Sequence, residues 1–420
     1  MAELTPYWHP FANMAEVRGR ELVLVQGRGC EVTDQAGRTY LDATAGLWYC
    51  NVGYGRSQIV EAVTRQLHAL PAYSTFGPYA TEPTLQAAAR IADLSPIDDA
   101  AVFLTSGGSD AVETAAKLVR AYWTALDQPQ RRVIVGRPRA YHGMHAYGTS
   151  LAGIAANRET FGDMVPDVAH VAEDSLEAVR QEIERIGPEN VGAFIGEPVI
   201  GAGGVFPPPD GYWPGVAELC REHGILLIDD EVICGFGRLG RQFGCERYGV
   251  VPDMITFAKG VTSGYMPLGG LIVSPRIKEP FWEGEGRWFR HGYTYSGHAA
   301  GCAAALANLD IIASEDLLGR VVSLEPILAE TAQALLDHPL VGAVRTEGLL
   351  CAVEFTSDRV AGTPGLANEI VLSCREQGLL TRALGQVALQ ISPALIIEPA
   401  QIEQLFDSVR LALDAVQRRH

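Results

Sequence analysis

One stretch constrains the fold of this chain more than any other. The apolar run Ile225–Ile228 stops at three carboxylates, Asp229–Glu231. Such a short β-rich run, bounded by charged residues, is typical of a buried parallel strand that ends at the edge of a sheet. A second β-prone run, Met254–Ala258, leads to Lys259 in a glycine-containing turn. We therefore expect two neighbouring strand ends to present opposite charges.

The sequence around these two strands alternates between helix and strand. Helical periodicity predicts helices near residues 57–70, 82–93, 109–126, 175–186, 212–223 and 297–313. Short β-rich runs predict strands at Ala101–Leu104, Val133–Val135, Val191–Ile195, Leu226–Ile228, Met254–Phe257 and Leu271–Val273. This alternation indicates an α/β fold, in which helices cover both faces of a mostly parallel sheet.

The two ends of the chain have a different texture. After residue 314 the pattern predicts helices at 316–336, 365–376 and 399–418, and strands at Leu349–Phe355, Gly378–Arg382 and Val387–Ile391. Near the N-terminus, an aromatic arm over residues 1–20 precedes a predicted hairpin, Cys30–Asp34 with Thr39–Asp42. We expect a large domain over residues 51–313 and a smaller α+β domain over residues 314–420. The arm and hairpin within residues 1–50 are expected to join the smaller domain.

The charge balance excludes one class of partner. The chain has 33 basic and 50 acidic side chains, a net charge of −17, which would repel nucleic acid. Eight cysteines form no C-x-x-C pair and several lie in apolar runs, as expected in a reducing compartment. No signal-peptide pattern or apolar run of membrane-spanning length is evident. The prediction is a cytoplasmic protein that binds neither nucleic acid nor membrane.

A candidate phosphate site follows the strand at Val102–Leu104. The turn Thr105–Asp110, Thr-Ser-Gly-Gly-Ser-Asp, opens a strong helix. Free backbone N–H groups at a helix start, beside a small hydroxyl side chain, form a ready site for phosphate. The alternative is a capping turn, with Ser109 or Asp110 as the N-cap residue.

Lys259 and Asp230 together indicate a particular cofactor. A lysine at the end of a buried strand is usually ion-paired or forms a Schiff base. Pyridoxal 5'-phosphate takes a lysine at its aldehyde and an acidic partner at its ring nitrogen, so this pair suits it. The alternative is a structural Asp–Lys ion pair, which would be favoured if the phosphate turn were missing.

Two other patterns lack the sequence context that their functions require. Residues Gly235–Gly240 satisfy G-x-G-x-x-G, but no convincing amphipathic helix follows them, so we do not expect a dinucleotide site. His142 and His145 lie three residues apart, but no cysteine or acidic cluster completes a metal set. We expect no metal.

These motifs, taken in order, resemble the class III (ω-type) aminotransferases, a family of fold type I enzymes that use pyridoxal phosphate. The resemblance covers roughly residues 20–400. The matching runs are Gly46–Gly55 with Trp48, Ser106–Ser109, Tyr141–Gly143, Gly196–Pro198, Asp230–Arg238, Phe257–Gly260 and His291–His298.

The resemblance implies roles for the residues around the ring. Lys259 forms the Schiff base with the cofactor and later moves the proton, while Asp230 pairs with the ring nitrogen. Val232 and Tyr141 cover the two faces of the ring.

The resemblance also implies a phosphate site and a shared active site. Gly108 and Ser109 hold the phosphate, and His142 and Glu197 lie beside the cofactor. Thr294 reaches the phosphate of the neighbouring subunit, which implies a homodimer, with a tetramer as an open alternative.

Substrate choice rests on two further matches. Arg382 matches an arginine that grips the carboxylate of a keto acid, for which a guanidinium fork is suited. Trp48 resembles a tryptophan of the pocket wall. The family often has Gly-Asp after this arginine, where this chain has Gly385-Gln386. The implied reaction moves an amino group from an amine or ω-amino acid to a keto acid such as pyruvate. The alternatives are an aminomutase or decarboxylase on the same scaffold and, more remotely, a non-catalytic effector-binding protein.

Overall fold

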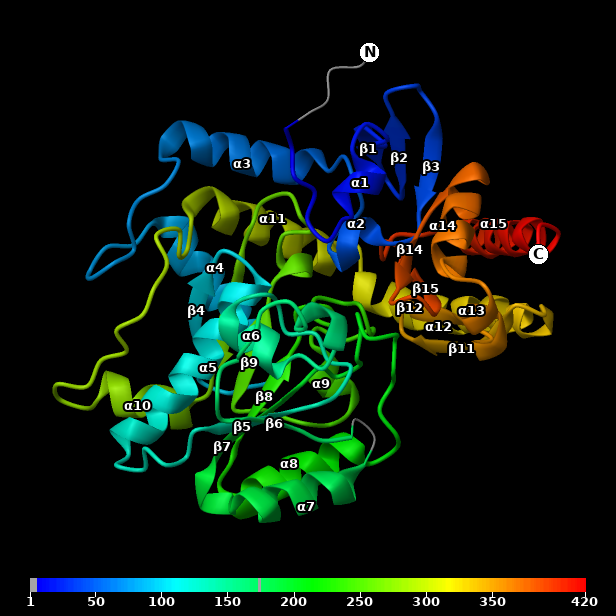
Figure 1. Cartoon of the computed structure of the whole chain (residues 1–420). Helices are drawn as coiled ribbons and strands as arrows, with labels where there is room; N and C mark the ends of the chain where they lie inside the picture. The colour runs from blue at the N-terminus through cyan, green and yellow to red at the C-terminus, as the bar shows by residue number, and fades with distance from the viewer. Residues whose placement is uncertain (1–5, 173–174) are drawn as a thin grey trace.

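The computed structural model describes residues 6–172 and 175–420, and Figure 1 follows the chain from blue to red. The predicted N-terminal arm is therefore described from residue 6 onward, while residues 1–5 lie outside the described part. The described chain forms three sheets, one of seven strands and two of four.

The largest sheet has the order β4-β10-β9-β8-β7-β5-β6. Strand β10 is antiparallel to both of its neighbours, and the other adjacent pairs are parallel. The α/β expectation is thus confirmed. The strands are β4 (Ala101–Thr105), β5 (Val133–Gly136), β6 (Val168–His170), β7 (Val191–Gly196), β8 (Leu226–Asp230), β9 (Met254–Phe257) and β10 (Gly269–Val273).

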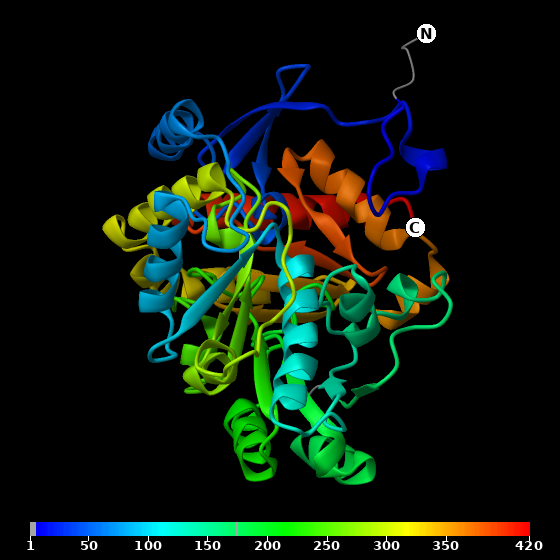
Figure 2. The same ribbon diagram turned by 90° about the vertical axis from the view of Figure 1, so that its left-hand side faces the viewer.

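Helices cover both faces of this sheet. On one face α5 (Gly108–Ala125) lies along the strands, as Figure 2 shows in cyan, with α6 (Ala146–Leu151) and α10 (Pro275–Trp282) beside it. The other face is covered by α4 (Glu82–Leu94), α7 (Leu176–Ile186), α8 (Tyr212–His223), α3 (Ser57–Ala69) and α11 (Ala299–Ser314).

Strand β8 is buried along its whole length, and its side chains alternate between the two faces. Leu226 and Ile228 pack in the cluster beneath α5, whereas Leu227 packs in the cluster beneath α7 and α8. The same alternation places Asp230 on the α5 face and Asp229 on the opposite face. This separation determines what the two acids do.

The two smaller sheets bring the ends of the chain together, at the right of Figure 1. One contains β1 (Leu24–Arg28), β2 (Glu31–Asp34), β3 (Thr39–Asp42) and β13 (Leu379–Leu380), and the parallel pair β3–β13 joins the N-terminal hairpin to the C-terminal segment. The other contains β11 (Val341–Glu347), β12 (Leu350–Phe355), β14 (Arg382–Leu384) and β15 (Ala388–Ile391). The helices α12 (Leu317–Gln333), α14 (Leu366–Glu376) and α15 (Pro399–Gln417) pack against these strands.

One predicted strand was wrong in this region. The run Gly378–Arg382 was expected to form one strand beside Val387–Ile391, but it divides at Thr381. The part before Thr381 pairs with β3, and the part after it pairs with β15. The Thr381 hydroxyl donates to the Gln390 carbonyl (2.5 Å), which holds the chain where it passes from one sheet to the other. Local β propensity does not reveal such an exchange of partners.

The described chain also contains four short α-helices and four 3-10 helices. The short α-helices are α1 (Met14–Val17), α2 (Ala45–Trp48), α9 (Gly244–Arg247) and α13 (Ser357–Gly362). None of the helices that the structure describes is long and apolar enough to cross a membrane.

Candidate active site

A cavity of about 130 Å³ opens where strands of the large sheet end at their carboxyl edge. This edge is where open α/β sheets usually bind ligands. Eight of the predicted site residues line the cavity, namely Gly108, Ser109, Tyr141, His142, Glu197, Asp230, Val232 and Lys259. The remaining lining residues are Val112, Gly143, Ile233 and Ala258.

Asp230 ends β8 and is held by three donors. The Val232 amide (3.2 Å) and the Thr256 hydroxyl (3.0 Å) donate to its Oδ1, and His142 Nδ1 lies 2.6 Å from its Oδ2. Asp230 is 3% exposed and His142 is 1% exposed, so water screens this pair weakly. These three donors hold the Asp230 carboxylate at the edge of the cavity.

Lys259 follows β9 in a turn whose backbone is strained. Its φ angle is 43°, in the left-handed region that non-glycine residues rarely adopt. The Asn308 side chain donates to the carbonyls of Gly260 (2.8 Å) and Val261 (2.9 Å), which fixes the turn. Burial lowers the pKa of the Lys259 ammonium, while Asp230 and Glu197 oppose the shift. A lowered pKa leaves more of the amine uncharged and nucleophilic.

The helix α5 begins at this cavity without a side-chain cap. Its N-cap residue is Gly107, and the amides of Gly108 and Ser109 start the helix, where no intrahelical acceptor exists for them. Gly108 and Gly143 have no side chain, so neighbouring residues can pack closely against their backbone. A Cβ atom at Gly108 would lie 2.8 Å from Val232 Cγ1, and one at Gly143 would lie 2.5 Å from Ser109 Oγ.

Tyr141 and Glu197 are linked through the backbone. Glu197 Oε1 accepts from the Tyr141 amide (3.0 Å), and Oε2 accepts from the Gly201 amide (3.0 Å). Burial raises the pKa of the Glu197 carboxyl, and His142 opposes the shift. Glu197 therefore fixes the segment that carries Tyr141.

The other three predicted residues lie outside the lining of this cavity. The Arg382 guanidinium stacks 5.2 Å from the centre of the Trp48 ring, and its charge acts on both Tyr141 and Lys259. Trp48 is 3% exposed and belongs to a buried cluster with Ile233. Thr294 lies in an exposed turn.

Sequence reasoning missed the residues that support this site. The Thr256 hydroxyl donates to Asp230, and the Asn308 side chain donates to the turn that contains Lys259. Neither residue belongs to a recognisable motif. The period of two in β9 was a signal for Thr256, because it shares a face with Asp230 through the β8–β9 pairing. No sequence signal identified Asn308, which comes from α11.

The residues of the cavity fit pyridoxal phosphate. The Asp230 carboxyl group, a partly desolvated lysine amine and a helix start without a side-chain cap lie around one cavity, and they match the ring nitrogen, the aldehyde and the phosphate respectively. The alternative, a purely structural ion pair between Asp230 and Lys259, does not explain why α5 begins without a side-chain cap. In the described residues no salt bridge joins Asp230 to Lys259; the partner of Asp230 is His142.

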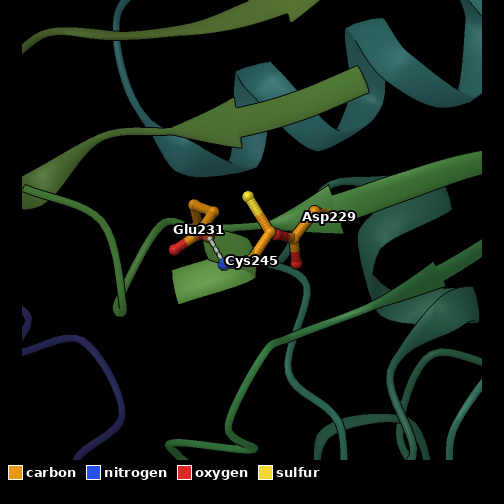
Figure 3. A group of neighbouring side chains, drawn as sticks. All are labelled: Asp229, Glu231 and Cys245. Atoms are coloured by element: carbon orange, nitrogen blue, oxygen red, sulfur yellow. Dashed lines mark hydrogen bonds between the residues drawn. The ribbon is translucent and has the colours of Figure 1, made fainter. Parts of the chain in front are cut away.

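A second group of acids lies behind the same strand. Asp229, Glu231 and Cys245 are all buried, and their possible ligand atoms lie within 4.8 Å of one another. Figure 3 shows the three side chains. The Cys245 amide donates to Glu231 Oε1 (2.7 Å), but among the described residues both oxygens of Asp229 and Oε2 of Glu231 have no hydrogen-bond partner. The sequence predicts no metal site, but these three side chains have the spacing of metal ligands.

The electrostatics of this rear group favour a bound proton. Burial, and then the Glu231 charge, raise the pKa of Asp229 well above its usual range. Burial also raises the pKa of Glu231 to about 7. Two carboxyl groups this close in a dry site cannot both ionise without a cation. One proton shared by Asp229 and Glu231 would supply a donor to the oxygens that have no hydrogen-bond partner.

The rejected G-x-G-x-x-G run has a structural role. Arg238, in its centre, is fully buried and donates to the Asn51 side chain (2.9 Å) and to the carbonyls of Pro393 (2.5 Å) and Leu349 (3.4 Å). This run ties the large sheet to the C-terminal part of the chain and does not open a long helix.

Comparisons with known proteins agree with this geometry. The family model described as aminotransferase class-III matches residues 14–413. The chain is 40% identical to a putrescine–pyruvate aminotransferase of Pseudomonas aeruginosa, covering 96% of this chain and 93% of the relative. It is 37% identical to a diaminobutyrate–2-oxoglutarate transaminase of Halomonas elongata, covering 94% and 90% respectively.

Two solved structures share the whole fold. An (S)-enantioselective ω-transaminase from Thermomicrobium roseum superposes with a TM-score of 0.93 at 41% identity, covering 97% of this chain and 96% of that one. An amine transaminase from an uncultivated Pseudomonas species, solved in its PLP-bound form, gives 0.93 at 36% identity, covering 98% and 99%.

Proposed function

The chain belongs to the class III aminotransferases, and from that premise we propose that it transfers an amino group from a primary amine or ω-amino acid to a small keto acid such as pyruvate. One observation carries the proposal, the cavity in which Lys259, Asp230 and the start of α5 converge. Relatives named for putrescine and for diaminobutyrate favour an amine or ω-amino donor. The relative named for pyruvate supports pyruvate as the acceptor.

We propose pyridoxal 5'-phosphate as the cofactor. When bound, it supplies an electron sink that makes the C–H bond next to the substrate nitrogen acidic. Gly108 and Ser109 would bind its phosphate, and Asp230 would keep its ring nitrogen protonated by placing a negative charge beside it. Val232 and Tyr141 would lie against the two faces of the ring.

The side chains of this chain then have separate tasks. Lys259 would be the nucleophile that holds the cofactor, and its amine would then accept the proton from the substrate carbon. The lowered pKa of Lys259 suits both tasks, because an uncharged amine accepts the proton. The His142 ring holds the Asp230 carboxylate in place, and the Glu197 carboxylate holds the Tyr141 backbone amide.

Arg382 and Trp48 would form the substrate side of the site. The guanidinium is a fork that can bind a carboxylate through two hydrogen bonds. Arg382 is exposed in the single chain, and Tyr141 is the group that opposes the lowering of its pKa by burial. We propose that Arg382 binds the carboxylate of the keto acid or ω-amino acid over the Trp48 ring.

We further propose a homodimer with shared active sites, and leave a tetramer as an alternative. Thr294 lies in an exposed turn, available to the phosphate site of a second subunit. Beside this turn is a hollow of about 670 Å³ lined by aromatic residues that include Phe76, Tyr79 and Trp288. These side chains are more than half exposed in the single chain, as expected of a surface that a partner covers.

Two broader assignments accompany this proposal. We assign the cofactor to the unit over residues 51–313 and propose that residues 1–50 and 314–420 form the second unit. The eight cysteines are all buried and free, which suits a reducing compartment, and we propose a cytoplasmic location.

The test is product formation by purified enzyme. Butylamine, putrescine and β-alanine would each be supplied with pyruvate or 2-oxoglutarate, and alanine or glutamate would be measured. Lys259→Ala should abolish product while retaining cofactor, and Lys117→Ala, a more exposed lysine paired with Glu113, should keep full activity. Borohydride treatment of the wild-type enzyme should label Lys259.

The rival reactions give different results in this assay. An aminomutase or a decarboxylase would consume the amine without aminating a separate keto acid. Full activity in Lys259→Ala would disprove the assigned role of the lysine.

A further inference from the structure

The loop that follows β3 carries Trp48 on a strained backbone. Ala45 has a φ angle of 46° and Trp48 a φ angle of 60°, both in the left-handed region, and Gly46 between them has a φ angle of 69°. Non-glycine residues adopt this region only when the surroundings enforce it. The short helix α2 is therefore an irregular turn, and some interaction must hold it.

Asp42, the last residue of β3, provides that interaction. Its Oδ1 accepts from the amide (2.9 Å) and the hydroxyl (2.7 Å) of Thr44. Its Oδ2 accepts from the Gly46 amide (2.6 Å) and the Tyr54 hydroxyl (2.7 Å). Asp42 is 4% exposed. One buried carboxylate thus binds donors from both ends of the segment that contains Trp48.

The carboxylate is itself fixed to the sheet. Asp42 pairs with Leu380 of β13, and its amide donates to the Cys30 carbonyl (2.9 Å). Two residues after this pairing, β14 begins at Arg382, whose guanidinium stacks on the Trp48 ring. Asp42 therefore connects the strand that leads to Arg382 with the loop that carries the ring beneath it.

We propose that Asp42 is a positioning residue that sets the affinity for the carboxylate of the keto acid by holding Trp48 beneath Arg382. This inference rests on the proposed role of Arg382. Asp42 touches no reacting atom, and its effect passes through the orientation of the guanidinium.

The chain offers a matched control in Asp34. It is 7% exposed, ends the neighbouring strand β2, and accepts from two turn amides, of Ala36 (2.9 Å) and Arg38 (3.0 Å), and from the Tyr40 hydroxyl (2.8 Å). Its turn does not carry a residue of the proposed site. A loss of general stability should affect Asp34→Asn and Asp42→Asn alike.

The experiment measures steady-state kinetics of the holoenzyme with pyruvate varied. In Asp42→Asn we expect KM for pyruvate to rise about 10-fold, the size of one lost hydrogen bond to a charged group, and kcat to change by less than about 3-fold. In Asp34→Asn, KM should stay within about 2-fold of the wild-type value at a similar loss in Tm. In an Arg382→Ala background, Asp42→Asn should have no further effect on KM, because the two residues act in series.

The remaining outcomes contradict either the role of Asp42 or the proposed acceptor site. An unchanged KM in Asp42→Asn, or an equal rise in KM with and without Arg382, overturns the inference alone. An unchanged KM in Arg382→Ala overturns the proposed acceptor site, and the inference with it. If Asp42→Asn does not fold, Tyr54→Phe removes one of the four donors, and it should raise KM by about 2-fold only when Arg382 is present.

Discussion

Asp230 and Asp229 are neighbours in the sequence, but their carboxylates lie on opposite faces of strand β8. The front carboxylate, Asp230, has three donors, among them the His142 ring, and faces the cavity that holds Lys259. At the rear, Asp229 faces Glu231 and the Cys245 thiol, and among the described residues its oxygens have no partner. Donors stabilise the charged form, whereas a second buried acid destabilises it.

The comparison shows that a run of three acids is not one feature. Alternation along the strand directs the middle acid, Asp230, into the cavity. The two outer acids, Asp229 and Glu231, lie on the rear face, where a proton or a cation must offset their negative charge. If a proton shared by Asp229 and Glu231 neutralises the rear group, that group contributes to the pH dependence of folding rather than to catalysis.

The largest expected difference between the faces is catalytic. Asp230→Asn removes the negative charge that would keep the ring nitrogen protonated. An opposite charge a few ångströms away shifts a pKa by about 1–3 units, so kcat should fall by about 10- to 1,000-fold. Asp229→Asn, one residue away on the rear face, should change kcat by less than about 3-fold. Single-turnover rates with an amine donor measure both variants.

Equal losses in the two variants would contradict the comparison. They would mean that the rear acids also act on the reaction, or that any amide at the end of β8 disturbs the site. Bound cofactor, read by absorbance, separates lost chemistry from lost binding.

The second difference concerns stability and pH. Since the pKa of Glu231 is raised to about 7 and that of Asp229 is raised well above its usual range, the folded protein retains protons that the unfolded chain releases above about pH 4. Stability from the rear pair is therefore fully present at low pH and declines as the pH rises through this range, by about 1.4 kcal/mol per pKa unit. Asp229→Asn removes one such acid, so its Tm relative to wild type should increase between pH 5 and pH 8.

Other titratable groups face the rear pair, and they must stay unchanged if the pH dependence is to be assigned to Asp229 and Glu231. Asp230 and Cys245 act on Asp229, Cys245 also acts on Glu231, and neither neighbour changes in Asp229→Asn. A Tm difference that stays flat from pH 5 to pH 8 would argue against a shared proton. One equivalent of divalent metal in the wild-type protein, absent from Asp229→Asn, would show that a cation occupies the place of the proton.

The sequence predicted the front face better than the rear. Lys259, Asp230 and the turn at Gly108 and Ser109 could be located because each is a charged or glycine-rich break in a strong periodic pattern. The three acids in a row were visible too, but Cys245, the third member of the rear group, lies on a short helix after an irregular loop. No local pattern predicts that approach. The exchange of partner sheets at Thr381 was missed for the same reason, since long-range pairing decides it.

A smaller effect on the front face would come from Thr256. Its hydroxyl is one of three donors to Asp230, so Thr256→Val leaves the carboxylate charged but held less firmly. We expect a loss of about 1 kcal/mol, or about 5-fold in kcat/KM, because one net hydrogen bond is removed. Thr262→Val is the control, since that buried hydroxyl donates to the Met266 carbonyl (2.6 Å) and not to a site residue. Equal kinetics in Thr256→Val and wild type would show that the other two donors suffice.

The smallest effect is expected at Cys245, and it tests how the rear face is neutralised. Cys245→Ala removes the thiol but keeps the backbone amide that donates to Glu231. If a proton lies between Asp229 and Glu231, the thiol is only a weak additional donor, and the variant should lose about 1 kcal/mol or less, mostly from the small cavity left behind. If a cation lies there instead, the thiolate is one of its three protein ligands, and the variant should lose both the metal and much of its thermal stability. Thermal unfolding with and without a chelator distinguishes these results, because a chelator can destabilise a site that holds a metal but not one that holds a proton.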